Sequence, residues 1–481
     1  MKYQTTFSVT GHLKVIILLL LLFLPACQTI EATGERQLTL IGEQQEIQMG
    51  KEAYEQIQQT MDLYPDQSLQ TYVNELGVRI AASTERPELP WTFHVLDDDV
   101  VNAFALPGGY IYVTRGIMTH LENEAQLAGI LGHEIAHVTA RHSVVRLSKS
   151  MLAQFGLGVA RIVAPELQSL AQLAGTGLQF LFLKFSREDE IESDLLGVRY
   201  MRNVREDPVE LMDVMAMLNR VSGSEEGQRL PQWASTHPYP ENRLEIIAEH
   251  IETLEPVDYL PVERESYLQK IDGMAYGKNP REGIVRKNAF FHPKMRFSFQ
   301  FPEGWQVINQ KQAVIGISPE QDATLQLSLS PQDTMEGALR TFFRQEGISA
   351  ARTEKVEING ISAVAGSFQA RAQQGIVLGR AMFTEFQGRV FQIVGFAAQP
   401  RWQAYDRAVL RSMRSFEELT DPELLEAKPL RIEIVRIEES ITLDRLHANR
   451  GIPIPLEELA RLNQIETDET LSPGSLLKIV R

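Results

Sequence analysis

His133 and His137 stand four residues apart in a segment whose pattern is typical of a buried helix. Asn123 can cap the first turn of that helix. The apolar residues that recur at helical spacing are Leu127, Ile130, Leu131, Ile135 and Val138. Residues four apart lie about 40° apart around a helix, so both imidazoles project to the same side. The chain must therefore fold around a helix that presents two imidazoles to one point, where they can bind one metal ion.

A catalytic zinc ion takes three protein ligands and leaves one position for water. Glu134, between the two histidines, can act as general base on that water. A third histidine six residues after His137 would complete one known ligand set, but position 143 is serine. His142 would point about 140° away from His137 on a continuous helix, so we expect it to have a supporting or structural role. The remaining solution is a glutamate on a later helix, and residues 186–194 offer several.

Residues 133–137 read His-Glu-Ile-Ala-His, and residues 186–194 read Ser-Arg-Glu-Asp-Glu-Ile-Glu-Ser-Asp. Together they resemble the HExxH and SRxxExxAD motifs of BepA- and HtpX-type, CAAX-prenyl-protease-like zinc metallopeptidases, over about residues 43–250. The resemblance implies one Zn²⁺ per chain with Glu190 as third ligand, and Asp194 as the carboxylate that orients a ligand histidine. It implies a metalloendopeptidase with a mainly α, zincin-type (gluzincin) α+β domain. We expect Glu188 and Glu192 to be solvated charges.

His237 lies in the proline-bounded sequence of residues 236–240. A rigid loop returning over the cleft could place a neutral imidazole at the open zinc position, where it competes with water. We favour this inhibitory role over two alternatives, stabilisation of the oxyanion and a histidine hydrogen-bonded within a turn. Further candidates for contact with the oxyanion are Tyr239, Asn102 and Arg243.

The N-terminus has the pattern of a secretory signal. Lys2 and Lys14 precede an apolar run, residues 15–24, that is too short to span a bilayer and ends in Pro25-Ala26-Cys27. This end resembles the lipobox of bacterial lipoproteins, which implies a signal peptide over 1–26 and lipidation of Cys27. Cys27 is the only cysteine, so no internal disulfide can form. The resemblance implies a periplasmic, lipid-anchored protein at the outer membrane; a plain cleaved signal and an uncleaved anchor are the alternatives.

The pattern along the chain predicts several domains. A peptidase domain over 27–255 is followed by a linker over 256–283 and an α+β accessory domain over 284–418. Within the peptidase domain we expect strands at 91–96 and 110–113, the second on an exposed edge that could pair with an extended peptide. Residues 149–184 form a long apolar stretch without an uninterrupted membrane span, which we interpret as helices beside the cleft. The accessory domain carries no catalytic motif.

Residues 419–481 predict a strand, two helices and a strand, with Asn463 and Pro473-Gly474 between the last two elements. This β-α-α-β order resembles the LysM module, which binds N-acetylglucosamine chains in cell walls. Residues 439–440 are Glu-Ser where the module usually has Gly-Asp, so we expect weak glycan binding at best. The resemblance implies peptidoglycan as a second partner, beside the membrane.

The formal net charge of −16 and the absence of a basic stripe argue against nucleic acid as a partner. The expected substrates, by resemblance, are unfolded or misassembled envelope proteins. Two other functions stay open from the sequence. One is a catalytically idle, chaperone-like or wall-binding lipoprotein, and the other is a peptidoglycan amide hydrolase.

Overall fold

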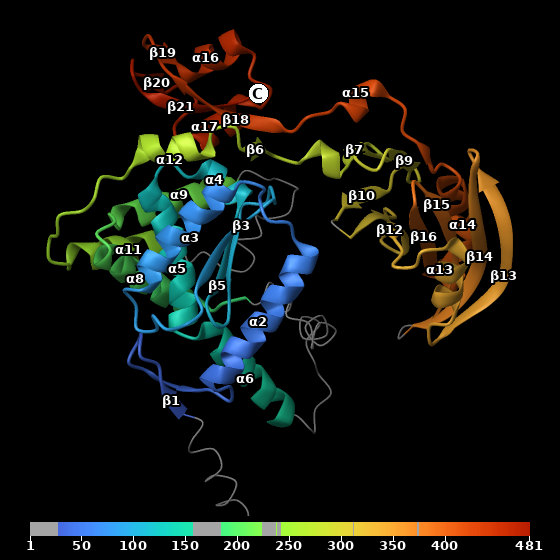
Figure 1. Ribbon diagram of the computed structural model, residues 1–481, viewed down its shortest axis with the longest axis horizontal. Helices are drawn as coiled ribbons and strands as arrows, with labels where there is room; N and C mark the ends of the chain where they lie inside the picture. The colour runs from blue at the N-terminus through green and yellow to red at the C-terminus, as the bar shows by residue number, and fades with distance from the viewer. Residues whose placement is uncertain (1–26, 157–183, 224–236, 238–241, 311, 373–374) are drawn as a thin grey trace, which may run out of the picture. The chain divides into compact units, whose positions relative to one another are not determined.

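The computed structural model describes residues 27–156, 184–223, 237, 242–310, 312–372 and 375–481 (Figure 1). The predicted signal peptide, most of the apolar stretch 149–184 and Tyr239 lie outside these residues. The chain divides into two compact units. Unit 1 combines the chain up to Tyr276 with Arg431–Arg481, and unit 2 is Gly277–Leu430. In the described part of the chain, no helix is both long and apolar enough to cross a membrane.

Unit 1 is built around helix α5 (Glu124–Thr139), in which every residue from Ala125 to Thr139 is buried. The side chain of Asn123 caps this helix by accepting a hydrogen bond from the backbone N–H of Gln126 at 2.8 Å. A helix that is covered on all sides occupies the centre of a domain. The helices that surround it in unit 1 are α2 (Glu43–Thr60), α3 (Gln67–Ala81), α4 (Arg115–His120), α6 (His142–Gly156), α8 (Arg187–Asn203), α9 (Val209–Gly223) and α11 (Arg243–Glu252).

A three-stranded sheet in unit 1 has the order β3-β5-β4, with β3 (Thr92–Leu96), β4 (Ala103–Leu106) and β5 (Tyr110–Thr114). Strand β5 runs parallel to β3 and antiparallel to β4. The expectation of an exposed edge at 110–113 is wrong, because β5 is the central strand and is buried throughout. The strand that occupies this edge is β4, which the sequence pattern left inside a connecting loop.

The expected linker over 256–283 also differs from the structure. Helix α12 (Arg264–Ile271) buries Tyr267, Leu268 and Ile271 in the core of unit 1. Strand β6 (Ala275–Tyr276) then joins a sheet of order β21-β18-β6, whose other two strands are β18 (Leu430–Arg436) and β21 (Leu476–Val480). The segment is therefore part of the folded unit, because its three apolar side chains recur at helical spacing and need a partner surface.

The C-terminal part of unit 1 has the expected order of elements: β18 (Leu430–Arg436), α16 (Leu443–Arg450), α17 (Leu456–Leu462) and β21 (Leu476–Val480). Strands β18 and β21 pair antiparallel, and the short strands β19 (Ile441–Thr442) and β20 (Thr470–Leu471) form a second pair. We call residues 431–481 the C-terminal module. Helix α17 packs against α4 and α9, so the module packs directly on the rest of unit 1 (Figure 1). Its relation to LysM stays a prediction.

Unit 2 is an α+β body with an antiparallel seven-stranded sheet. The strands, in spatial order, are β10 (Gln306–Asn309), β11 (Ala313–Ile317), β12 (Ala323–Leu329), β16 (Arg389–Ala398), β15 (Gly375–Phe386), β14 (Ile361–Ala372) and β13 (Ile348–Ile358). Helices α13 (Met335–Phe343) and α14 (Gln399–Met413) pack on this sheet. A smaller sheet has the order β17-β9-β8-β7, with β17 (Glu417–Glu418), β9 (Phe297–Gln300), β8 (Ala289–His292) and β7 (Ile284–Arg286).

Candidate metal centre

The α5 helix brings the two histidines of its motif to one point. The Nε2 atoms of His133 and His137 lie 3.1 Å apart, and both side chains are buried. With its hydrogen on Nδ1, where Asp194 Oδ1 lies 2.9 Å away, a neutral His133 presents the lone pair of Nε2 to this point. Burial and the neighbouring histidines hold the pKa of His137 well below its usual value. A neutral imidazole is the form that binds a metal ion.

Glu190 reaches this point from the first turn of α8. The turn is fixed by a capping box, in which Ser186 and Asp189 exchange hydrogen bonds between side chain and backbone at 3.2 and 2.9 Å. Helices α5 and α8 approach closely at Gly132 and Gly197, where a Cβ on Gly132 would lie 3.3 Å from the Gly197 carbonyl oxygen. The carboxylate oxygens of Glu190 consequently lie 3.6 Å from His133 Nε2 and 3.5 Å from His137 Nε2.

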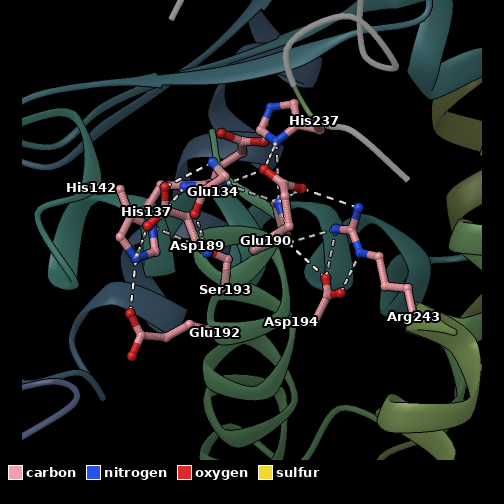
Figure 2. A network of polar contacts seen from close by, with 12 residues as sticks. Glu134, His137, His142, Asp189, Glu190, Glu192, Ser193, Asp194, His237 and Arg243 are labelled. Carbon is pink, nitrogen blue, oxygen red and sulfur yellow. Dashed lines mark hydrogen bonds and ion pairs between the residues drawn. The ribbon is translucent and has the colours of Figure 1, made fainter. Parts of the chain in front are cut away.

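His237 is the fourth member of the cluster (Figure 2). Its Nδ1 lies 2.9 Å from Glu190 Oε1 and 3.4 Å from His133 Nε2. One nitrogen or oxygen atom from each of His133, His137, Glu190 and His237 can be chosen so that all four lie within 4.8 Å of one another. The structure therefore brings together the three predicted ligands and the residue predicted for the fourth position.

These separations fit a divalent metal ion. Ligand atoms bound at 2.0–2.1 Å in a tetrahedron are about 3.3–3.4 Å apart. The three pairs among His133, His137 and Glu190 lie at 3.1, 3.5 and 3.6 Å. Two imidazole nitrogens and a carboxylate also form a donor set that zinc accepts in catalytic sites. The residues present thus fit a metal centre with these three ligands.

Glu134 lies beside the centre without taking part in the ligand cluster. Both of its carboxylate oxygens are buried, and within the described residues neither accepts a hydrogen bond. Its Oε1 is 3.7 Å from His237 Nε2. Burial raises the pKa of the Glu134 carboxyl, although His237 and His133 act in the opposite direction. A buried carboxylate with unused lone pairs and a raised pKa is equipped to accept a proton from a small molecule at the centre.

Asp194 and Arg243 support the ligands from behind. The Nδ1 of His133 donates to Asp194 Oδ1 at 2.9 Å. The buried guanidinium of Arg243 contacts both oxygens of Asp194 and lies 3.1 Å from Glu190 Oε2 (Figure 2). Burial opposes ionisation of both carboxyls, but Arg243 and neighbouring histidines lower the pKa of Asp194 and of Glu190 below their usual values. Arg243 is thus engaged by two carboxylates, which differs from the role at an oxyanion that the sequence suggested.

His142 returns to the centre because the chain turns sharply between α5 and α6. Arg141, at the corner, has a φ of 58° in the left-handed region, so α5 does not continue into α6. His142 Nδ1 lies 2.9 Å from His137 Nδ1, and His142 Nε2 lies 3.0 Å from Glu192 Oε2. Glu188 is exposed as expected, and Glu192 is 31% exposed but also bonds His142. This contact depends on the turn at Arg141, which the local sequence pattern does not predict.

Two further predicted residues, Cys27 and Asn102, belong to the described part of the chain. Strand β1 (Cys27–Thr29) starts at Cys27 and pairs with β2 (Arg36–Leu38). The backbone of Asn102 is hydrogen-bonded to Thr114 next to β4. A residue that sequence reasoning missed is Phe185, whose ring stacks on His137 with centroids 3.9 Å apart. Its position directly before the capping serine was the only available signal.

Residues 67–251 match the Peptidase M48 family. The Beta-barrel assembly-enhancing protease of Escherichia coli K12 is 27% identical over 231 residues, which cover 46% of this chain and 47% of that protein. The mitochondrial metalloendopeptidase OMA1 of Schizosaccharomyces pombe is 33% identical over 211 residues, covering 42% of this chain and 60% of that protein. OMA1 of Danio rerio is 35% identical over 185 residues, covering 36% of this chain and 38% of that protein.

The chain thus spans about half the length of the curated relatives it matches. The matched region contains α5, α8 and His237, and with them all four members of the metal centre. The buried His-His-Glu cluster, with the buried carboxylate of Glu134 beside it, is the chemistry expected of a metallopeptidase. The part of this chain that matches the Peptidase M48 family is therefore also the part that holds a metallopeptidase centre.

Proposed function

We propose that this protein is a lipid-anchored zinc metalloendopeptidase that hydrolyses peptide bonds in envelope protein quality control. The observation that carries the proposal is the buried convergence of His133, His137 and Glu190, with the buried carboxylate of Glu134, which accepts no hydrogen bond among the described residues, next to them. An idle binding protein would have no need to keep a carboxylate buried without a hydrogen bond, because its desolvation costs stability.

His133, His137 and Glu190 would hold the zinc ion. When bound, it would acidify a water molecule and polarise the scissile carbonyl. Glu134 then accepts the proton of the attacking water and passes it to the leaving amine. Asp194 keeps the hydrogen of His133 on Nδ1, which leaves Nε2 of that ring for the metal. Arg243 holds Asp194 and Glu190 ionised in a buried site.

The edge strand β4 contacts α5 and offers a surface for the substrate. Among the described residues one edge of β4 has no strand partner, and an extended peptide could add to it by main-chain hydrogen bonds, which would favour unfolded chains over folded ones. Relatives named Beta-barrel assembly-enhancing protease support misassembled envelope proteins as the substrate class. The C-terminal module makes peptidoglycan the second partner to be tested.

The deciding experiment compares the parent with Glu134→Gln. We expect the variant to retain about one zinc per chain and to lose proteolysis of an unfolded protein, because the base is removed while the ligands stay. Zinc content is measured by elemental analysis, and hydrolysis is measured with and without chelator. Purified peptidoglycan serves as the second substrate. Full proteolytic activity of Glu134→Gln, or release of wall peptides instead of protein cleavage, would remove the proposal.

The anchor is tested separately at Cys27. Lipidation there predicts that Cys27→Ser carries no acyl label and is recovered without a lipid, either free or on an uncleaved signal. Metabolic labelling with a fatty acid, followed by fractionation of inner and outer membranes, measures both points. Unchanged acyl labelling of the variant would exclude Cys27 as the lipidated residue and leave the peptidase assignment intact.

A further inference from the structure

The two predicted histidine ligands differ in the residue that contacts their Nδ1 atom. His133 donates to a carboxylate, Asp194, as the family motif implies. His137 instead meets a third imidazole, that of His142, at 2.9 Å between the two Nδ1 atoms. His142 is 5% exposed and in turn meets Glu192. We call His142 and Glu192 the His137 relay, and neither residue is a fixed position of the two motifs.

The hydrogens of this relay can be placed from the chemistry of the ligand. When Nε2 of a neutral His137 faces a metal ion, its ring carries the hydrogen on Nδ1. That hydrogen must be donated, so His142 Nδ1 is the acceptor. The hydrogen of a neutral His142 then sits on Nε2 and is donated to Glu192 Oε2 at 3.0 Å. Asp189 Oδ1 also lies 3.9 Å from His142 Nε2, beyond hydrogen-bond distance, so Glu192, which is 31% exposed, is the acceptor.

The surrounding contacts hold His142 in this place. Arg141, one residue earlier, fixes the corner by bonding Glu46 at 2.8 Å and the carbonyl of Ile41 at 2.9 Å. Phe185 stacks on the ring of His137. Ser193 Oγ lies 3.3 Å from His142 Nδ1, farther than the 2.9 Å of His137 Nδ1. The closer donor to the Nδ1 lone pair of His142 is therefore His137.

We infer that His142 and Glu192 are positioning residues for His137. His142 fixes the orientation and the tautomer of the His137 ring, and Glu192 keeps His142 in the tautomer that can accept. This assignment rests on the proposed function, since it takes a metal ion as the partner of His137 Nε2. Outer partners of this kind raise the affinity of a site for its metal by about 10–100-fold.

The test is the zinc affinity of the full chain, measured by competition with a chelating dye at neutral pH. His142→Leu places an apolar side chain of similar size there and removes the acceptor, so we expect zinc affinity to fall by about 10–100-fold. His142→Asn returns an oxygen near the place of Nδ1, and we expect it to recover most of that affinity. Thermal melting of the metal-free proteins shows whether the two variants fold equally well.

Glu192 is tested against a matched neighbour. Glu188 lies on the same helix, is exposed, and carries the same charge. Glu192→Ala should lower zinc affinity by about threefold to tenfold, because His142 loses the partner that fixes its tautomer. Glu188→Ala removes the same charge without touching His142 and should stay within about twofold of the parent.

Two results would overturn the assignment. Parent affinity in His142→Leu would show that His137 needs no acceptor, and an equal loss in the Leu and Asn variants would show that His142 only fills space. An equal effect of Glu192→Ala and Glu188→Ala on zinc affinity would show that Glu192 acts only through its charge. Because the readout is metal affinity relative to the parent, failure to cleave proteins would count against the proposed function and not against this relay.

Discussion

His237 contacts both a predicted metal ligand and the predicted base. These two contacts bear on whether the fourth metal position is closed in the resting protein. Its Nδ1 lies 2.9 Å from Glu190 Oε1, and its Nε2 lies 3.7 Å from Glu134 Oε1. Burial disfavours a charged imidazole, but the two carboxylates outweigh burial and raise the pKa of His237 above its usual value. A metal ion bound by the other three residues would favour the neutral ring instead, and a neutral His237 lies close enough to them to take the fourth position.

We therefore predict that His237→Ala increases the rate of proteolysis while zinc content and melting temperature persist. The physical reason is that water replaces an imidazole at the fourth position. The measurement is turnover of an unfolded protein substrate by equal amounts of zinc-loaded parent and variant. If His237 instead stabilises the oxyanion, turnover falls by roughly a hundredfold or more. Rates within about twofold would leave His237 as a histidine bonded within its turn.

Single residues at this centre were predictable to the extent that their partners are close in sequence or belong to a motif. His133, Glu134 and His137 follow from helical spacing alone, and Glu190 followed from the family resemblance. The contacts of Arg243 and Glu192 were not predictable for a different reason. Their partners come from other helices, and the contact between Glu192 and His142 also depends on a backbone corner at Arg141 that the local pattern does not predict.

Among the elements, the strands of unit 2 show what alternation can and cannot predict. Apolar and polar residues alternate at 313–317, 324–329, 376–386 and 390–397, a pattern that predicts strands, and these runs coincide closely with β11, β12, β15 and β16 in the middle of the sheet. The hairpin β13–β14 was missed, because β13 at the sheet edge exposes a run of charged residues. Strand β4 was missed because four residues before a Pro-Gly-Gly turn give too short a signal.

Strand β8 supplies a prediction on pH. Burial, with Lys294 and Arg389 nearby, lowers the pKa of His292 to about 4, against 6.5 ordinarily. The Nδ1 of His292 accepts a hydrogen bond from the Met295 N–H at 3.2 Å, which requires that nitrogen to be unprotonated. Between pH 6.5 and about 4 the unfolded chain binds a proton that the folded chain does not. The contribution of His292 to stability is therefore lost as pH falls through that window, by about 3 kcal/mol.

We expect His292→Gln to remove this part of the pH dependence, because its amide does not titrate. The free energy of unfolding of the full chain is measured in urea at intervals from pH 7 to pH 4 for parent and variant. The difference between the two should change steadily between pH 6.5 and 4 and level off below pH 4. A difference that is constant across the whole range would contradict a depressed pKa at this position.

On the scale of the whole chain, unit 2 is an insertion between two paired strands of unit 1. The chain leaves unit 1 after β6 and re-enters it at β18, and these strands are neighbours in one sheet. The backbone N–H of Ile432 donates to the carbonyl of Met274 at 2.8 Å. The expected series of separate domains differs from this arrangement. A sequence pattern locates elements along the chain, but it does not show that residues 158 positions apart pair with each other.

The C-terminal module is attached through a buried lysine. The ammonium of Lys478 on β21 is fully buried and lies 2.8 Å from Glu122 Oε1. It also donates to the carbonyl oxygens of Thr119 and Leu121 at 3.0 and 2.9 Å. These acceptors lie within four residues before Asn123, the cap of α5. A second contact joins Gln464 of the module to Gln126 in the first turn of that helix.

We predict that Lys478→Met lowers the free energy of unfolding by about 3 kcal/mol, because three buried acceptors lose their donor at once. Arg481→Met is the matched control at the end of the same strand, since Arg481 is 58% exposed and pairs with a half-exposed Glu433. Its change should stay within about 0.5 kcal/mol. Urea denaturation of the full chain measures both values, and limited proteolysis should release the module sooner from Lys478→Met. Equal stability of the two variants would show that the module folds and docks independently of Lys478. It would also show that the start of α5 does not depend on this lysine.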